Sequence, residues 1–200
     1  ADYAGGVPTD FWEMAGSELD KIKPVFMLAE DDRVLALLDK AFNVNYGWEL
    51  YNIMNKIAKG QNNAKHVEMH LTKIQNIYPK GTYPMYFTSN HDENSWNGTE
   101  YERLGDAVKT MAVLTFTAPG MPLIYSGQEA GLNRRLAFFE KDEIDWNDLT
   151  MQEFYKDLIT LKKENPALWN GEYGGQLKIF ETSNKSILAF ERSKVGNKVI

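Results

Sequence analysis

Three carboxylic residues stand at positions where a buried strand is expected to end. Glu30 directly follows one apolar run, Asp92 comes shortly after another, and Asp2 precedes the first expected helix. In a parallel α/β fold the carboxyl ends of the strands share one rim, so these three side chains should lie close together. Paired carboxyl groups on such a rim suit glycoside hydrolysis, in which one attacks the anomeric carbon while another protonates the departing oxygen.

Glu30 has the sequence context of an acid catalyst. It emerges from the apolar residues 26–29, and desolvation there would favour its neutral, protonated form. The adjacent Asp31 and Asp32 would raise the pKa of Glu30 further if they stay ionised. Carboxylates at strand ends are also common as helix caps, so for any one of these residues taken alone a capping or solvated surface role is favoured.

An alternation of strands and helices is expected to position these groups. Apolar runs predict four strands, and longer periodic segments between them predict helices. Capping boxes at Thr99–Glu102 and Thr150–Glu153 predict the starts of the last two helices. This order indicates a parallel sheet covered by helices. The predicted strands are 24–29, 41–46, 83–88 and 121–126, and the predicted helices are 10–22, 34–40, 49–59, 65–77, 99–117 and 150–165.

The pattern changes after Pro166. A glycine-containing turn at 171–175 is followed by short apolar runs at 178–181 and 187–192, with a further turn before the final two residues. Short strands separated by turns are typical of a β-meander. We therefore expect an α/β domain over residues 1–170 and the start of an all-β domain over residues 171–200.

Composition excludes several classes of protein. The chain has 200 residues and a formal net charge of −6, a balance that argues against nucleic-acid binding. Its apolar runs are too short to predict a membrane-spanning segment. The absence of cysteine excludes disulfides, thiolate metal sites and cysteine nucleophiles. Because the chain begins without Met and ends within an expected strand, we expect a piece of a longer protein. Its localisation is left open, with a periplasmic or secreted location as the working hypothesis.

Several segments resemble the alpha-amylase family of glycoside hydrolases, in the order that the family has them. Residues 85–92, Met-Tyr-Phe-Thr-Ser-Asn-His-Asp, resemble its strand-seven signature, and residues 24–30 resemble the strand-five segment that ends in the acid/base glutamate. Residues 118–129 resemble its strand-eight segment, and residues 1–4 resemble the tail of its strand-four motif. The Ile-Asp-Trp of residues 144–146 also fits the family.

The resemblance implies a partial TIM (β/α)₈ barrel followed by the beginning of an all-β sandwich domain. A whole barrel needs roughly 250 residues, so this chain would supply the end of unit four and units five to eight. The N-terminal half of the barrel would be missing, together with the Phe-Arg that precedes the nucleophile in the family. Since half a barrel exposes sheet edges, we expect the 200-residue chain to be inactive by itself.

The resemblance also implies roles for individual residues. Asp2 would be the nucleophile that forms a covalent glycosyl-enzyme, and Glu30 would be the general acid and later the base. Asp92 would bind sugar hydroxyls and stabilise the oxocarbenium-like transition state, while His91 would hydrogen-bond the same sugar. The expected outcome is retention of the anomeric configuration, with the first two carboxyl groups about 5–5.5 Å apart.

Other residues admit two interpretations. Asn90 is a substrate-binding candidate from the Asn-His-Asp motif, and Trp96 could stack on a glucose ring or pack on the rim. Tyr46 and Trp48 have the same ambiguity, and packing is favoured for them.

His66 and His70 have a spacing that can bind a metal, but they lack a third ligand and the metalloprotease order, so packing or surface positions are favoured. We predict no metal site among these residues.

The expected activity is hydrolysis of α-glucosidic bonds in starch-like glucans or maltooligosaccharides. A transglycosylase or trehalose synthase of the same family is the enzymatic alternative, and a non-catalytic glucan-binding protein with a retained barrel is the alternative from another class. The chemistry should need no organic cofactor, because carboxyl groups perform both the acid/base and the covalent steps. In the family, structural calcium is held mostly by a domain inserted after strand three, which is outside these residues.

Overall fold

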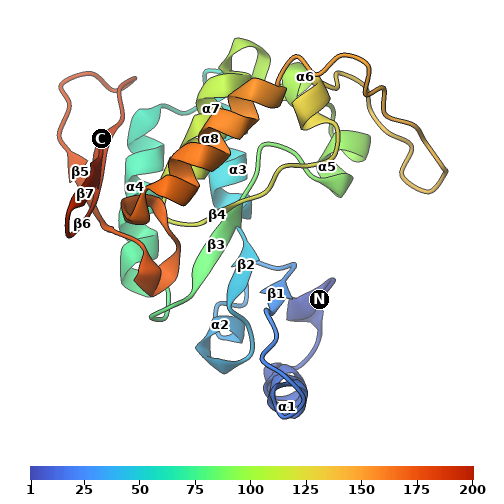
Figure 1. Cartoon of the computed structure of the whole chain (residues 1–200), viewed down its shortest axis with the longest axis vertical. Helices are drawn as coiled ribbons and strands as arrows, with labels where there is room; N and C mark the ends of the chain where they lie inside the picture. The colour runs from blue at the N-terminus through green and yellow to red at the C-terminus, as the bar shows by residue number, and fades with distance from the viewer.

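A parallel sheet of four short strands forms the centre of the first part of the chain. The computed structural model describes residues 1–200. The strands are β1 (Leu28–Ala29), β2 (Val44–Tyr46), β3 (Tyr83–Tyr86) and β4 (Met121–Pro122). They lie side by side in chain order, each parallel to the next (Figure 1). All four carboxyl ends therefore face the same edge, as the alternating pattern predicts.

Helices connect and cover these strands. Most of them lie on one side of the sheet, where α3, α4, α7 and α8 pack together (Figure 1). The α-helices are α1 (Thr9–Asp20), α2 (Leu37–Lys40), α3 (Trp48–Ala58), α4 (Ala64–Ile77), α5 (His91–Trp96), α6 (Glu100–Leu104), α7 (Val108–Thr117) and α8 (Gln152–Glu164). Short 3₁₀ turns complete the connections: η1 (Ala4–Gly6), η2 (Gly105–Ala107), η3 (Gln128–Ala130), η4 (Pro166–Leu168) and η5 (Gly171–Tyr173). None of the helices has the length and hydropathy needed to cross a membrane.

The main core lies between the sheet and these helices. Tyr86 of β3 is completely buried there, and apolar residues of α4 at helical spacing, including Leu71 and Ile74, pack against the same cluster. A smaller second core lies under α1 and α2, where Trp12 packs edge-on against Phe42. The sheet is therefore covered by a large helical layer over its later strands and a thin one near β1.

The first predicted strand is shorter in the structure than its apolar run suggested. Only Leu28 and Ala29 pair with β2, and Phe26 is exposed. Pro24 has no N–H to donate, and the Met27 N–H bonds to the Asn43 side chain rather than to a neighbouring strand. The prediction of a buried strand over 24–29 is thus wrong for residues 24–27, where Pro24 and the Met27 N–H donate to no neighbouring strand.

The predicted helix at 99–117 is also divided. Its start is confirmed: Thr99 accepts a hydrogen bond from the Glu102 N–H, and the Glu102 carboxylate accepts one from the Thr99 N–H. Gly105 then adopts a positive φ of 53°, which ends α6 before α7 begins. The capping box predicted at Thr150–Glu153 is wrong, since α8 has Met151 at its N-cap and no side-chain cap.

The last part of the chain is an antiparallel sheet, as the change of pattern predicts. Its strands β5 (Gln176–Phe180), β6 (Ala189–Lys194) and β7 (Asn197–Val199) pair in chain order. Arg192 of β6 is buried and donates hydrogen bonds to the carbonyls of Thr117, Trp169 and Gly175. This side chain ties the antiparallel sheet to the end of α7. The division into two domains at residue 170 stays a prediction.

Candidate active site

The first residue of the chain extends the parallel sheet by one further bridge. The Ala1 ammonium group donates to the Leu28 carbonyl at 2.7 Å, and the Glu30 N–H donates to the Ala1 carbonyl at 2.9 Å. This is the pattern that a parallel neighbour makes around Ala29. Asp2 therefore follows directly after a position that is paired with β1, and it lies on the same rim as Glu30.

Glu30, His91 and Asp92 form the centre of the site. Glu30 follows β1, whereas His91 and Asp92 occupy the first turn of α5, shortly after β3. The His91 Nε2 atom lies 3.5 Å from Glu30 Oε1 and 3.7 Å from Asp92 Oδ1. Glu30 is the most enclosed of the three, with 19% of its side chain exposed against 48% for His91 and 38% for Asp92. The rim expected from parallel topology brings these side chains together although 61 residues or more separate Glu30 from the others in sequence.

The surroundings of Glu30 raise its pKa, so this carboxyl group stays protonated to a higher pH than an ordinary glutamate does. Burial is the main factor that raises the pKa of Glu30 above its usual range. The neighbouring charge of His91 lowers that pKa, while the charges of Asp2 and Asp92 raise it. A buried carboxyl group with two further carboxylates nearby is suited to donate a proton.

The source of this effect differs from the sequence prediction. Asp31 and Asp32 are not among the main causes of the shift at Glu30. The buried Asp31 carboxylate accepts hydrogen bonds from the N–H groups of Arg33 and Val34 and from the Arg33 guanidinium. These bonds outweigh its burial and lower the pKa of Asp31, so this carboxylate organises the turn after β1. The carboxylates with the main effect on the pKa of Glu30 are Asp2 and Asp92, which come from other strand ends rather than from the adjacent positions.

Tyr46 at the end of β2 lies beneath the same charges. Burial, followed by the charges of Glu30, Asp92 and Asp2, raises the pKa of Tyr46 to about 12. Its ring stacks on Trp48 at 5.8 Å and meets Phe87 edge-on at 5.6 Å. The prediction of packing for Tyr46 and Trp48 is confirmed, and the phenol remains protonated near the carboxyl cluster.

Asn90 occupies a buried position at the start of α5. Its side chain is completely buried and caps α5, because its Oδ1 accepts a hydrogen bond from the Glu93 N–H at 2.8 Å. This position suits holding the first turn of α5, and with it His91 and Asp92, in place. The expectation that Asn90 contacts substrate stays a prediction.

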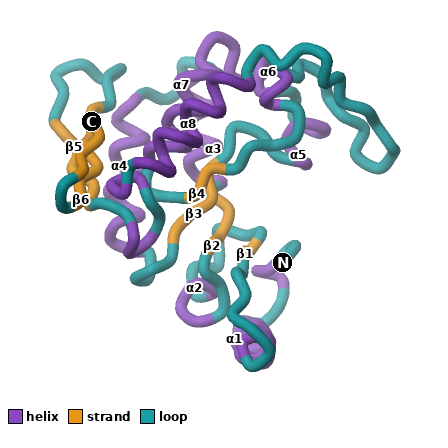
Figure 2. The backbone as a smooth tube through the Cα atoms, viewed as in Figure 1, coloured by secondary structure: helices purple, strands orange, loops and turns teal.

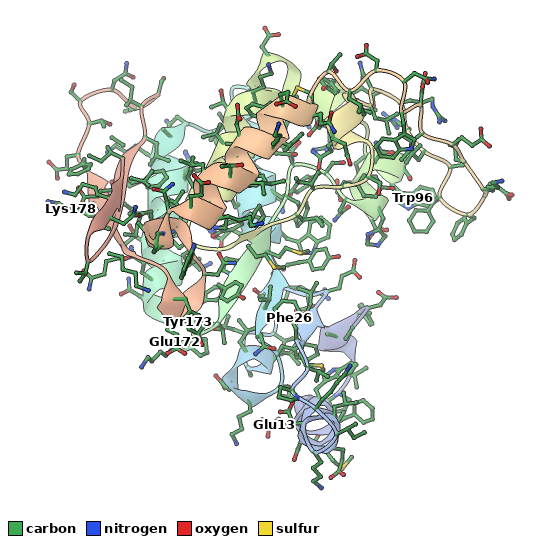
Figure 3. The ribbon with its side chains drawn as sticks, viewed as in Figure 1. Glu13, Phe26, Trp96, Glu172, Tyr173 and Lys178 are labelled. Atoms are coloured by element: carbon green, nitrogen blue, oxygen red, sulfur yellow. The ribbon has the colours of Figure 1, made fainter.

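Trp96 is exposed at the end of α5 and lies among rings that the sequence prediction did not include. Its centroid is 5.1 Å from that of Phe138 and 6.1 Å from that of Phe139, both on the long segment before α8. Figure 3 shows Trp96 on the side of the molecule where this segment projects. Two adjacent phenylalanines in a loop rich in charged residues were the signal that could have identified them.

The strand-eight segment contributes a buried support for the rim. Gln128 Nε2 lies 2.8 Å from Thr88 Oγ1 and 2.5 Å from Glu100 Oε2, and its Oε1 accepts from the Tyr125 N–H. Burial raises the pKa of Glu100, while the bonds from Thr88 and Gln128 oppose that shift. This network joins the segment just after β3, the first turn of α6 and η3. The sequence prediction included neither Glu100 nor a specific role for Gln128.

The two histidines of α4 have packing roles, as predicted. His66 Nδ1 accepts a hydrogen bond from the Asn63 N–H and so completes the cap of α4. His70 is buried, with its Nε2 3.1 Å from the Tyr86 hydroxyl. Metal-ligand atoms instead converge at Glu30, His91 and Asp92, where they all lie within 4.8 Å of one another. The same arrangement of side chains also suits proton transfer, so it does not by itself indicate a metal. The prediction of no metal site stays a prediction.

Comparison with known proteins identifies the family. The model of the alpha-amylase catalytic domain matches residues 38–175, more than half of the chain. The chain belongs to the alpha-amylase family. The match to the alpha-amylase catalytic domain includes Asn90, His91, Asp92 and Trp96, whereas Asp2 and Glu30 precede the matched residues.

Individual relatives agree with the alpha-amylase assignment. An alpha-amylase of Haloarcula japonica is 27% identical over 172 residues, which cover 84% of this chain and 25% of the relative. An alpha-1,4-glucan:maltose-1-phosphate maltosyltransferase of Picrophilus torridus is 27% identical over 96% of this chain and 31% of its own length. The chain thus spans between a quarter and a third of these relatives.

Structural similarity shows the alpha-amylase catalytic fold. The crystal structure of a maltogenic alpha-amylase from Thermotoga neapolitana superimposes with a TM-score of 0.80 at 21% sequence identity. The similarity covers 95% of this chain and 44% of that one. The fold is therefore that of the TIM-barrel catalytic domain, with a C-terminal antiparallel sheet.

Proposed function

We propose that this chain carries the catalytic carboxyl groups of a retaining glycosidase that cleaves α-glucosidic bonds in starch-like glucans or maltooligosaccharides. The observation that supports this most directly is the convergence of Glu30, His91 and Asp92 at the carboxyl ends of the strands, with Asp2 on the same rim. A raised pKa on the most enclosed carboxyl group is what an acid catalyst needs at neutral pH.

In the proposed reaction, Glu30 begins as a neutral acid and Asp2 as a carboxylate. The Asp2 oxygen attacks the anomeric carbon as the glycosidic bond breaks, and Glu30 gives its proton to the departing oxygen. Water then attacks the same carbon, Glu30 takes the proton of that water, and the bond to Asp2 breaks. Two displacements on opposite faces leave the anomeric configuration unchanged.

The remaining two residues assist the charge that develops on the sugar. Asp92 is partly exposed at the rim, where a negative charge on its carboxyl group would stabilise an oxocarbenium-like transition state. His91 lies between Asp92 and Glu30 and can donate a hydrogen bond to a sugar hydroxyl. The proposed chemistry uses these side chains and needs no organic cofactor.

We propose further that residues 1–170 form the second half of a barrel whose other strands come from residues outside these 200. β1 and β4 are the outer strands of the described sheet, with Ala1 adding a single bridge beside β1. The chain also spans less than half of the solved structure that it resembles. The isolated chain should accordingly be inactive, and measurable starch hydrolysis by it would contradict this part of the proposal.

The decisive test uses the full-length protein that contains this segment, with maltoheptaose as substrate. Asp2→Asn, Glu30→Gln and Asp92→Asn should each lower kcat by about 10²–10⁴-fold. Asp106→Asn is the matched control, since Asp106 is an exposed carboxylate away from the rim. NMR of the freshly released product should show the α-anomer. An inverted product, or three variants with unchanged kcat, would overturn the proposal.

A same-family transglycosylase is the second candidate, and the similarity to a maltosyltransferase favours considering it. It would use the same carboxyl groups, but a sugar hydroxyl would replace water in the second step. Product analysis separates the two, because hydrolysis yields new reducing ends and transfer yields oligosaccharides longer than maltoheptaose. A non-catalytic glucan-binding protein would bind maltoheptaose and release neither product.

A further inference from the structure

A small cavity lies beside the segment that leads from β3 to His91 and Asp92. It encloses about 10 Å³ between the residues that follow β3, helix α5, the start of α6 and the residues that follow β4. The segments after β3 and β4 both run toward α5 and α6 (Figure 2). A volume of this size holds about one water molecule.

Two side chains that line this cavity have buried polar atoms without a hydrogen-bond partner. Ser89 and Glu100 are each only 2% exposed, and the unpartnered atoms are the Ser89 Oγ and the Glu100 Oε1. An unpaired buried polar atom is costly, and the cost is larger for a charged group, so such atoms normally meet a partner. The cavity therefore suits a small group that can both accept from a hydroxyl and donate to a carboxylate.

The other buried polar side chains around the cavity already have partners. Asn94 uses its Oδ1 and Nδ2 atoms on the backbone of the loop before α8. Gln128 uses its Oε1 on the Tyr125 N–H and its Nε2 on Glu100 Oε2, at 2.7 and 2.5 Å. The atoms left over are one hydroxyl and one carboxylate oxygen. A calcium ion takes about 6–8 oxygen ligands, whereas a buried water needs only about 2–4 polar partners, so this donor set favours water over a cation.

Helix α6 already holds the residues that lead into α5. The Thr88 Oγ1 donates to Glu100 Oε2 at 2.8 Å, and the Thr88 carbonyl accepts from the Arg103 guanidinium at 2.7 Å. Ser89 comes next in sequence, and it is followed by the Asn90 cap of α5. A bridge from Glu100 to Ser89 would thus be a third connection from α6 to the two residues just before this cap.

We propose that this cavity binds one water molecule that bridges Ser89 and Glu100, and that Glu100 is a positioning residue for His91 and Asp92. The water accepts a hydrogen bond from the Ser89 hydroxyl and donates one to Glu100 Oε1. Glu100 is not part of the carboxyl cluster, and its effect passes through Thr88 and Ser89 to the first turn of α5. The positioning role rests on the proposed function and adds to it how the rim is held.

A high-resolution crystal structure of the full-length protein that contains this segment tests the water directly. One oxygen-sized peak should lie about 2.6–3.2 Å from both Ser89 Oγ and Glu100 Oε1. In Ser89→Ala the peak should weaken or vanish, because the water loses its donor. A direct hydrogen bond between Ser89 and Glu100 without such a peak would overturn the water site. An anomalous peak at this position in crystals soaked with rubidium would assign it to a cation and overturn it as well.

Turnover of maltoheptaose by the same protein tests the positioning role. Glu100→Ala should lower kcat about tenfold or more and leave KM within about twofold, because displaced groups at the rim lose their fit to the transition state. Glu100→Gln keeps an acceptor for Thr88 and a polar atom toward the cavity, so it should recover much of the kcat. Glu153→Ala is the matched control, since Glu153 is an exposed glutamate in the first turn of α8, and its kcat should not change.

Kinetics measured well below each unfolding midpoint separate loss of position from loss of fold. If Glu100→Ala lowers the midpoint but keeps kcat, or if Glu100→Gln turns over no faster than Glu100→Ala, the positioning role is wrong. Should Glu100→Ala not fold, Ser89→Ala gives the same comparison, with an expected loss in kcat of about threefold at constant KM. An unchanged kcat in Ser89→Ala would then overturn the role.

The two measurements also separate this inference from the proposed function. If Glu30→Gln leaves turnover unchanged, the proposed function is wrong and the positioning role falls with it, whereas the crystallographic peak still decides the water site. If Glu30→Gln abolishes turnover but Glu100→Ala keeps the parental kcat, the proposed function stands and only the positioning role is overturned.

Discussion

The Tyr51 hydroxyl donates a hydrogen bond to the buried carboxylate of Glu93, and this contact joins α3 to α5. Asn97 donates a second hydrogen bond to the same carboxylate at 3.1 Å, and the Arg103 guanidinium lies 5.1 Å from the centre of the Tyr51 ring. Glu93 directly follows Asp92 in sequence. Helix α5, which carries His91 and Asp92, is therefore anchored through Glu93, whose side chain is not part of the carboxyl cluster at the rim.

Removal of that anchor should weaken both the fold and the site. Tyr51→Phe leaves the ring in place but takes away one donor from a buried carboxylate, which costs about 1–3 kcal/mol of unfolding free energy. Chemical denaturation measures the loss, and Tyr173→Phe, at an exposed tyrosine, is the control. Equal stability of the two variants would show that the Tyr51 hydroxyl contributes nothing to holding Glu93.

The cap at Asn90 gives a second test of how α5 is positioned. Asn90→Ala removes the acceptor of the Glu93 N–H and should destabilise the protein by about 1 kcal/mol. In the full-length protein it should also lower kcat by displacing His91 and Asp92. Asn90→Ser retains a capping oxygen and should restore much of both. If alanine and serine give the same kcat and stability, the capping role is wrong.

Glu30 should make the stability of the protein depend on pH with a definite sign. Because burial raises its pKa in the folded state, the folded protein binds the Glu30 proton more tightly than the unfolded chain does. The unfolding free energy should therefore fall as pH rises from the unfolded pKa, near 4.5, through the folded one. Glu30→Gln should remove this penalty and stabilise the protein at pH 7 relative to pH 4.

Denaturation curves at both pH values measure this difference. Glu181→Gln is the control, since Glu181 is an exposed carboxylate outside the site. The prediction is contradicted if Glu30→Gln lowers stability at pH 7 or has the same effect at both pH values. A gain in stability that accompanies loss of turnover is what a carboxyl group kept for chemistry, rather than for folding, should show.

Lys162 of α8 should produce the opposite slope at higher pH. Its buried ammonium group donates to the carbonyls of Phe116, Gly120 and Leu168, and no carboxylate accepts from it. Burial, with a smaller effect of the Arg192 charge, lowers the pKa of Lys162 to about 7. Between that value and 10.5 the unfolded chain binds the proton and the folded chain does not, so stability should rise with pH.

The expected slope approaches about 1.4 kcal/mol per pH unit for a single proton. Lys162→Met should flatten it between pH 7.5 and 9.5 and should also cost stability, since three carbonyls lose their donor. Lys163→Met, at the exposed neighbouring lysine, should leave the slope unchanged. Parallel slopes for the wild type and Lys162→Met would show that this lysine does not titrate in that range.

Local sequence patterns predicted the features that depend on near neighbours. The Thr99–Glu102 box forms because both partners lie within one turn, and no other group competes for those N–H groups. At Thr150–Glu153 the same pattern did not produce a cap: α8 begins at Gln152, one residue later than the pattern predicts, and the preceding Met151 N–H bonds to the distant Glu129 carbonyl. The strand predicted to include residues 24–27 did not form there, and again a distant group is the partner: the Met27 N–H donates to the Asn43 side chain.

The sequence by itself determined the order of strands and helices, the family, and the strand-end positions of Glu30 and Asp92, because parallel strands connected through helices must share one rim. Only the tertiary structure decided what surrounds those residues. It assigned the charges near Glu30 to Asp2, His91 and Asp92 rather than to Asp31, because electric fields act through space. It also buried Asn90 as a cap and brought Phe138 to within ring-contact distance of His91 and Trp96. Those contacts join segments more than 40 residues apart, and their formation depends on how the loop before α8 folds back onto α5.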